Sequence, residues 1–171
     1  MVGRSYGQRV FTRIGEAPAE RPITRLDGLG DGIPPHRAEW APVLSLLELP
    51  PGAEPLDARP RLDPGRVLFG LSHTDGNQHV NFLAYPKFVE QAALGRFVDR
   101  GLGARLLARR VELGYRKPAF AGDVLRIAVQ SFRSGDVLGI VAAFVETNAP
   151  DEGAWPDFGP IRCVARMILR A

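Results

Sequence analysis

Apolar residues recur at three- and four-residue intervals between positions 85 and 97, and this pattern predicts an amphipathic helix with one buried stripe. Pro86 fits the first turn of such a helix, because a backbone N–H has no intrahelical partner there. Gly101 is well placed to end the helix. The stripe consists of seven residues, six of them apolar or aromatic: Tyr85, Phe88, Val89, Ala92, Ala93, Arg96 and Phe97.

After this helix the period of the pattern changes to two, which is typical of strands with one covered face. The alternation predicts strands over 107–116, 125–130, 137–145 and 161–170, with Ser134-Gly135-Asp136 as a hairpin turn. In the last strand the arginines Arg162, Arg166 and Arg170 point away from the apolar side. That side is formed by Ile161, Cys163, Ala165, Met167 and Leu169.

A short apolar run at 67–71 precedes the helix, so the order is one strand, one helix and four strands in antiparallel hairpins. A lone helix and a lone sheet must bury their apolar faces against each other, which predicts an α+β two-layer domain over residues 66–171. Ten of the fifteen prolines precede residue 68. Residues 1–65 are therefore expected to form a Pro-rich extension that packs on the core, with a strand at Gln8 to Ile14 and a short helix around Trp40 to Leu47.

Composition narrows the range of partners and compartments. The chain has 171 residues, enough for one core, and a formal net charge of only +3, which gives no strong case for nucleic acid or an anionic membrane. Cys163 is the sole cysteine, so neither an intrachain disulfide nor a cysteine-based metal site can form. No signal peptide and no apolar run of about 20 residues is evident. A cytoplasmic protein that does not enter the membrane is expected.

The segment between the first core strand and the helix carries the candidate chemistry. Asp75, Asn77 and His79 follow one another at two-residue spacing, so an extended backbone would place all three side chains on one side. A carboxylate can act as general base or nucleophile, while an amide and an imidazole assist it. Each residue alone is more often structural, because Asp and Asn before a helix commonly cap it.

The run Asp75-Gly76-Asn77-Gln78-His79-Val80-Asn81 resembles the D-x-N-Q-H-V-N signature of plant-type acyl-carrier-protein thioesterases, which have the hotdog fold. The second half of the domain also resembles this family, since Val111 to Pro118 and Gly122-Asp123-Val124 are similar to the family's strand, turn and G-D-x-V sequence. In the related 4-hydroxybenzoyl-CoA thioesterases an aspartate matching Asp75 is catalytic and a tyrosine matches Tyr85. The resemblance covers roughly residues 66–171.

This resemblance implies a hotdog domain, a long central helix wrapped by an antiparallel sheet, that hydrolyses an acyl thioester of coenzyme A or of an acyl carrier protein. Asp75, Asn77 and His79 would be catalytic, and Asn81, Tyr85 and Glu90 would contact the substrate. For Tyr85 a packing role is the stronger interpretation. For Glu90 the stronger interpretation is an exposed or ion-paired glutamate on the helix. No cofactor and no metal is expected. Because a single sheet leaves open edges, a homodimer or a dimer of dimers is expected, with the site at the subunit boundary.

Two departures from the family pattern leave other functions open. The strand after the helix lacks the Glu or Cys of plant-type enzymes, and Phe82 replaces a second Asn after the H-V-N run. One alternative is a hotdog enoyl-thioester hydratase or dehydratase, although its D-x-N-P-x-H spacing is one residue longer than the spacing here. The other is a non-catalytic acyl-CoA-binding protein of a biosynthetic pathway, because a fold does not fix a function.

Overall fold

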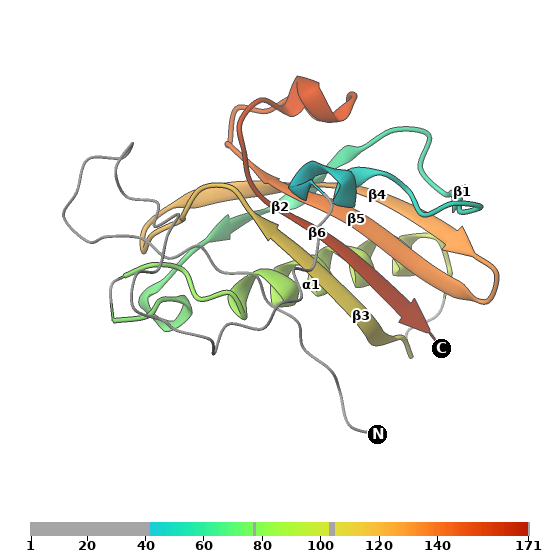
Figure 1. Cartoon of the computed structure of the whole chain (residues 1–171), viewed down its shortest axis with the longest axis horizontal. Coiled ribbons are helices and arrows are strands. Elements are labelled where there is room, and N and C mark those ends of the chain that lie inside the picture. The colour runs from blue at the N-terminus through green and yellow to red at the C-terminus, as the bar shows by residue number, and fades with distance from the viewer. Residues whose placement is uncertain (1–41, 77, 103–104, 171) are drawn as a thin grey trace, which may run out of the picture. The chain divides into compact units, whose positions relative to one another are not determined.

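The computed structural model describes residues 42–76, 78–102 and 105–170, where one helix packs against an antiparallel sheet (Figure 1). The strand order is β1-β4-β5-β6-β3, with β2 also paired to β4. Contacts divide the whole chain into Met1–Trp40 and Ala41–Ala171. The elements are η1 (Val43–Leu47), β1 (Glu54–Pro55), β2 (Arg61–Leu68), η2 (Leu71–His73), α1 (Ala84–Asp99), β3 (Leu107–Tyr115), β4 (Val124–Ser134), β5 (Val137–Val145), η3 (Trp155–Phe158) and β6 (Ile161–Arg170).

The α1 helix matches the prediction at both ends. Pro86 lies in its first turn, and Gly101 ends it with a left-handed φ of 66° that glycine adopts without strain. The Leu102 N–H donates to the Phe97 carbonyl at 2.8 Å and the Gly101 N–H to the Val98 carbonyl at 2.9 Å, which closes the last turn. The buried side chains are Ala84, Tyr85, Val89, Ala92, Ala93 and Phe97.

The predicted strands after the helix are confirmed. β4 and β5 form a hairpin whose register pairs Ser134 with Val137, and Gly135 has a φ of 59° in the two-residue turn. Four residues of the predicted apolar side of β6 are buried in the same cluster as Phe97: Cys163, Ala165, Met167 and Leu169. Ile161, predicted on the same side, belongs to the cluster on the other face, because the register with β5 shifts between Phe144 and Val145. The first strand differs from its prediction. β2 ends at Leu68 and extends back past Pro64, which lies where pairing with β4 is interrupted between Leu62 and Arg66. A proline is tolerated there because the irregular strand needs no N–H at that position.

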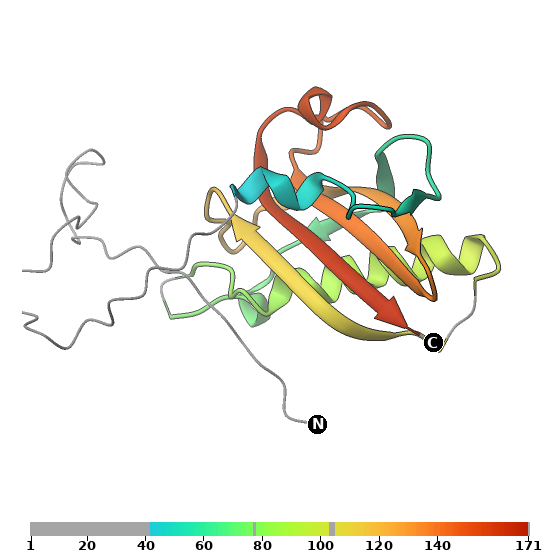
Figure 2. The same ribbon diagram turned by 45° about the vertical axis from the view of Figure 1, so that its right-hand side comes forward.

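The face of the sheet opposite α1 is also covered, which the alternating pattern did not predict. η1 and η3 lie on this face (Figure 2). Val164 lies among the arginines of β6, yet it is fully buried in one cluster with Leu47 of η1 and Phe158 of η3. Arg166 holds η1 in place by donating to the Ser45 carbonyl at 2.8 Å and the Glu48 carbonyl at 2.6 Å. Residues 42–65, assigned to the extension from sequence, thus lie within the unit Ala41–Ala171. The helix expected around Trp40 to Leu47 is the short 3₁₀ helix η1, and the strand at Gln8 to Ile14 falls outside the described residues.

β3 lies at an edge of the sheet, and its predicted covered face is largely open. It pairs with β6, and Leu107, Val111 and Tyr115 are exposed to 64%, 39% and 44%. Gly114 points to the opposite face, where a Cβ would lie 2.5 Å from Cγ1 of Val43. Glycine at this position therefore permits the close approach of η1.

A buried carboxylate joins the segment before β2 to the rest of the unit. Asp57 is 3% exposed and accepts hydrogen bonds from the Ser131 backbone N–H at 2.8 Å and from the Ser131 hydroxyl. The guanidinium of Arg100, just beyond α1, forms an ion pair with the same carboxylate. Burial raises the pKa of Asp57, but the Ser131 and Arg100 hydrogen bonds and the charge of Arg96 outweigh it, so the pKa lies below the ordinary 3.8.

We expect Asp57→Asn to lower the free energy of unfolding by about 3 kcal/mol at pH 7, because it removes one partner of a buried ion pair. Since the folded pKa is lowered, the carboxylate stabilises the fold above pH 4 and this contribution is lost as the pH falls through the folded pKa. Urea unfolding followed by circular dichroism at pH 7 and pH 3 measures both effects. Asp136→Asn, which breaks the exposed pair with Arg170, is the control and should cost less than about 1 kcal/mol. Equal losses in the two variants would contradict the buried role.

Candidate functional site

The segment that carries Asp75 and His79 is a tight hairpin and not the extended stretch expected from its spacing. The Asp75 N–H donates to the His79 carbonyl at 2.9 Å, and the Gln78 N–H donates to the Asp75 carbonyl at 2.9 Å. Gln78 has a φ of 61°, in the left-handed region, and Thr74 and Val80 form an isolated antiparallel bridge. The chain therefore reverses direction between Asp75 and His79, so alternation along a strand cannot align their side chains.

The turn nevertheless brings these two predicted residues together. Oδ1 of Asp75 accepts the backbone N–H of His79 at 3.1 Å, and both residues are exposed. A carboxylate that accepts a backbone N–H at a turn is held in one orientation, as an Asx-type turn requires. Asn77, the third predicted catalytic residue, lies outside the described residues.

A second loop, residues 119–123, supports the hairpin. The Val80 N–H donates to the Ala119 carbonyl at 2.8 Å, and the Ala121 N–H donates to the Gln78 carbonyl at 3.3 Å. The His79 and Phe120 rings meet edge to face, with centroids 5.0 Å apart. The imidazole therefore has an apolar neighbour on one side.

Gly122 and Asp123 give this second loop its shape. Gly122 has a φ of 91°, which side chains other than hydrogen disfavour, and its N–H donates to the Phe69 carbonyl at 2.8 Å. Oδ2 of Asp123 accepts the Phe120 N–H at 3.0 Å. The G-D pair of the sequence motif thus positions Phe120 beside His79 and links the loop to the end of β2.

Asn81 shapes the approach to α1. Its Oδ1 accepts the Leu83 N–H at 3.0 Å, and its carbonyl accepts the Ala84 N–H at 2.9 Å. These bonds satisfy backbone donors at the start of the helix, as capping residues do. Asn81 is exposed, and these hydrogen bonds give it a structural role. The substrate contact predicted for it from sequence stays a prediction.

Tyr85 lies inside the core. It is 2% exposed, and its ring centroid is 5.5 Å from that of Phe69 and 5.0 Å from that of Phe144. Burial, above all, raises its pKa to about 12. The side chain is therefore neutral at physiological pH and packs as the sequence suggested.

The other two candidates occupy different surroundings. Glu90 is exposed on α1, off the buried stripe. His73, whose role the sequence left open, packs its ring against Phe88 with centroids 5.2 Å apart. Its Nδ1 accepts the Gly70 N–H at 3.1 Å, which ties down the turn after β2.

Exposed apolar side chains surround the hairpin, and sequence reasoning did not single them out. We refer to Phe82, Leu83, Tyr115 and Phe120 as the apolar rim; they are exposed to 56%, 57%, 44% and 41%. The Tyr115 hydroxyl donates to the Phe82 carbonyl at 3.3 Å, which joins the end of β3 to the entrance of α1. Phe82 was noted only as a departure from a polar motif, and Phe120 lies in a loop where no periodicity marks it.

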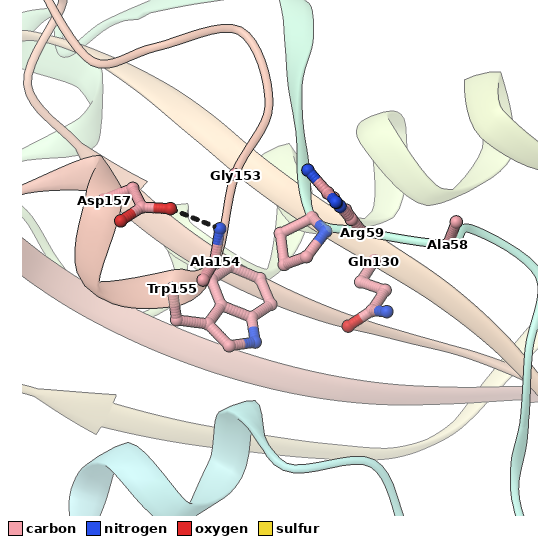
Figure 3. A pocket seen from close by; sticks show the side chains of 8 residues that line it. Ala58, Arg59, Gln130, Gly153, Ala154, Trp155 and Asp157 are labelled. Carbon is pink, nitrogen blue, oxygen red and sulfur yellow. Dashed lines mark hydrogen bonds between the residues drawn. The ribbon is translucent and has the colours of Figure 1, made fainter.

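A separate hollow of about 490 Å³ lies on the side of β4 that faces away from α1 (Figure 3). Gln130 contributes to it from β4, and Trp155 and Asp157 contribute from η3. Asp157 accepts the Ala154 N–H at 2.7 Å, so its carboxylate stabilises the start of η3 (Figure 3). Of the predicted site residues that the structure describes, none lines this hollow.

The helix and sheet have the hotdog arrangement, which confirms the fold predicted from sequence. The chain is similar in structure to a 1,4-dihydroxy-2-naphthoyl-CoA thioesterase from Synechocystis, at 13% identity and a TM-score of 0.53, over 65% of this chain and 80% of that one. It is also similar to a gentisyl-coenzyme A thioesterase, at 12% identity and a TM-score of 0.50, over 61% and 84% of the two chains. At such identities the likeness shows the fold.

No protein-family model matches the sequence, and comparison with curated proteins found no match. In the part of the chain that the structure describes, no helix combines the length and apolar character needed to cross a membrane.

We expect Asp123→Ala to release the loop that holds Phe120 against His79. The Phe120 amide loses its acceptor, so its hydrogen exchange, followed by NMR, should become at least about tenfold faster, equivalent to roughly 1.4 kcal/mol. Asp123→Asn keeps an oxygen at the same place and should retain most of the protection. Equal protection in Asp123→Ala and the unaltered chain would show that the carboxylate does not hold this loop.

Proposed function

We propose that this protein hydrolyses an acyl thioester at the hairpin that precedes α1. The observation that carries the proposal is the Asp75 carboxylate, exposed and oriented by the His79 N–H at 3.1 Å, beside a helix entrance flanked by apolar side chains. Two structures that share the fold are named as a 1,4-dihydroxy-2-naphthoyl-CoA thioesterase and a gentisyl-coenzyme A thioesterase. The D-x-N-Q-H-V-N resemblance lies on the same hairpin.

In this proposal Asp75 acts as general base on a water, or attacks the carbonyl carbon itself. On the water route, the oxygen of water adds to the carbonyl carbon and its proton passes to Asp75. The carbon–sulfur bond then breaks, and the departing sulfur takes a proton from His79 or from solvent. Asn77 would hold the water or the carboxylate. The products are a free acid and a thiol.

The negative oxygen formed on attack needs donors. The Leu83 and Ala84 N–H groups already donate to Asn81, so they are engaged in the cap. The first-turn N–H of Tyr85 has no intrahelical acceptor, and the positive end of the α1 dipole lies behind it. We assign the oxyanion to this N–H, which gives Tyr85 a substrate contact through its backbone while its ring stays in the core. Asn81 would contact the substrate beside the cap it forms.

The thiol carrier is coenzyme A or an acyl carrier protein, and both carry a phosphopantetheine arm. Arg116 and Lys117 are exposed in the turn that leads from Tyr115 to Phe120. The Arg162 guanidinium holds this turn by donating to the Pro118 carbonyl at 3.1 Å. Two cations on a fixed turn next to the apolar rim suit the phosphates of the carrier.

Asp75→Asn is expected to reduce thiol release from acyl-CoA by about 10² to 10⁴-fold, because the amide can neither accept a proton from water nor attack. His79→Ala should reduce turnover less, since solvent can protonate the departing thiolate. Release of free thiol is followed with a chromogenic disulfide over short, medium, long and aromatic acyl-CoAs. Asp99→Asn, at the far end of α1, is the matched control and should keep full turnover. Binding of acyl-CoA in calorimetry together with thiol release at the buffer rate on every acyl group would refute hydrolysis.

We also propose that the protein is a homodimer, or a dimer of dimers, that pairs through β3. In the described sheet β3 has a partner on the β6 side, and its exposed apolar residues Leu107 and Val111 adjoin the free edge. Glu90 would then face the second subunit or the substrate from α1.

Val111→Arg is expected to convert the dimer to a monomer, because an unpaired charge would be placed in an apolar contact. Light scattering coupled to size exclusion measures the mass. Val98→Arg, on a part of α1 that is 57% exposed, is the control and should remain dimeric. A monomeric mass for the unaltered chain at working concentration would contradict the pairing.

A further inference from the structure

The space between the first turns of α1 and the sheet is filled by aromatic rings. Phe69, Tyr85 and Phe144 are each at most 2% exposed. Tyr85 lies within 5.0 to 5.5 Å of the other two, centroid to centroid, and Phe69 meets Phe88 edge to face at 5.7 Å. Rings at these distances leave no room for an alkyl chain between them.

Tyr115 closes the side of this space that faces the apolar rim. Its ring meets Tyr85 edge to face with centroids 5.3 Å apart, and its hydroxyl reaches the Phe82 carbonyl at 3.3 Å. One side chain from β3 thus spans the gap between the sheet and the segment that enters α1. Burial also raises the pKa of Tyr115, so the phenol stays a neutral donor across the physiological range.

From this geometry we infer that Tyr115 is a specificity-determining residue that limits the acyl group to a short chain or a planar ring. The inference rests on the proposed thioester hydrolysis. A thioester carbonyl at the Asp75 hairpin cannot send its acyl group under α1, because Tyr115 and the rings behind it occupy that path. The acyl group must instead lie on the apolar rim.

The rim itself suits a small group. Besides Tyr115, its members Phe82, Leu83 and Phe120 come from two loops that meet at His79. Aromatic side chains present edges and faces that pack well against another flat ring. Methylenes beyond the rim would remain in water and would add nothing to the binding of the transition state.

The test compares kcat/KM for benzoyl-, butyryl- and decanoyl-CoA, with every substrate kept below its micelle concentration. The unaltered protein should turn over decanoyl-CoA no better than butyryl- or benzoyl-CoA, because methylenes that remain in water add no binding in the transition state. Tyr115→Ala opens the path toward Tyr85 and should raise the decanoyl-to-butyryl ratio by at least about tenfold. Tyr115→Phe keeps the ring, so its ratio should match that of the unaltered chain.

The ratio is taken within one variant, so a loss of folded protein does not change it. If Tyr115→Ala does not fold, Tyr115→Leu removes the outer half of the ring and should shift the ratio in the same direction. The role of Tyr115 would be overturned if the unaltered protein preferred decanoyl-CoA, or if folded Tyr115→Ala or Tyr115→Leu kept the same decanoyl-to-butyryl ratio. Neither result would contradict the proposed hydrolysis. Absence of thiol release from all three substrates would overturn hydrolysis and this inference together.

Discussion

Burial of the α1 stripe against a single sheet constrains everything else in the described unit. The stripe starts with Tyr85, whose ring is packed between Phe69 and Phe144, so the first turn of the helix is fixed by contacts to β5 and to the residue after β2. The hairpin at 74–80 lies between that residue and that turn, so the segments on both sides of it lead to packed positions. Core packing therefore holds the candidate site at the helix entrance, together with the hydrogen bonds of the hairpin.

The polar contacts of the hairpin join it to the neighbouring loop. The hairpin and the loop at 119–123 share backbone hydrogen bonds through Val80 and Gln78, and the second loop is tied to Phe69 through Gly122. Backbone groups of each loop thus find hydrogen-bond partners in the other loop. An exposed carboxylate at such a junction keeps its orientation without being desolvated, which leaves Asp75 able to meet a solute.

Periodicity predicted the helix, its glycine end, the β4–β5 hairpin and the buried side of β6, because each of these depends on neighbours close in sequence. The turn at Asp75 was not predictable in this way, since two-residue spacing fits an extended strand, whereas hydrogen bonds among Asp75, Gln78 and His79 reverse the chain here. Which side chains cover the second face of the sheet could likewise not be predicted from a local pattern. Residues 43–62 are rich in proline and lack a period, so nothing local shows that Leu47 buries Val164. Asn77 stays a prediction from the motif.

The covered second face has a consequence for where the molecule can act. Leu47 of η1 and Phe158 of η3 cover the apolar side chains that the sheet would otherwise present away from α1. Exposed large apolar side chains do occur at the entrance of α1, as with Phe82 and Phe120, and along the edge strand β3. Tyr115 belongs to both places, as the last residue of β3 and as a member of the rim. A second copy paired on β3 would therefore adjoin the surface assigned to the acyl group, so assembly and substrate choice would depend on the same tyrosine.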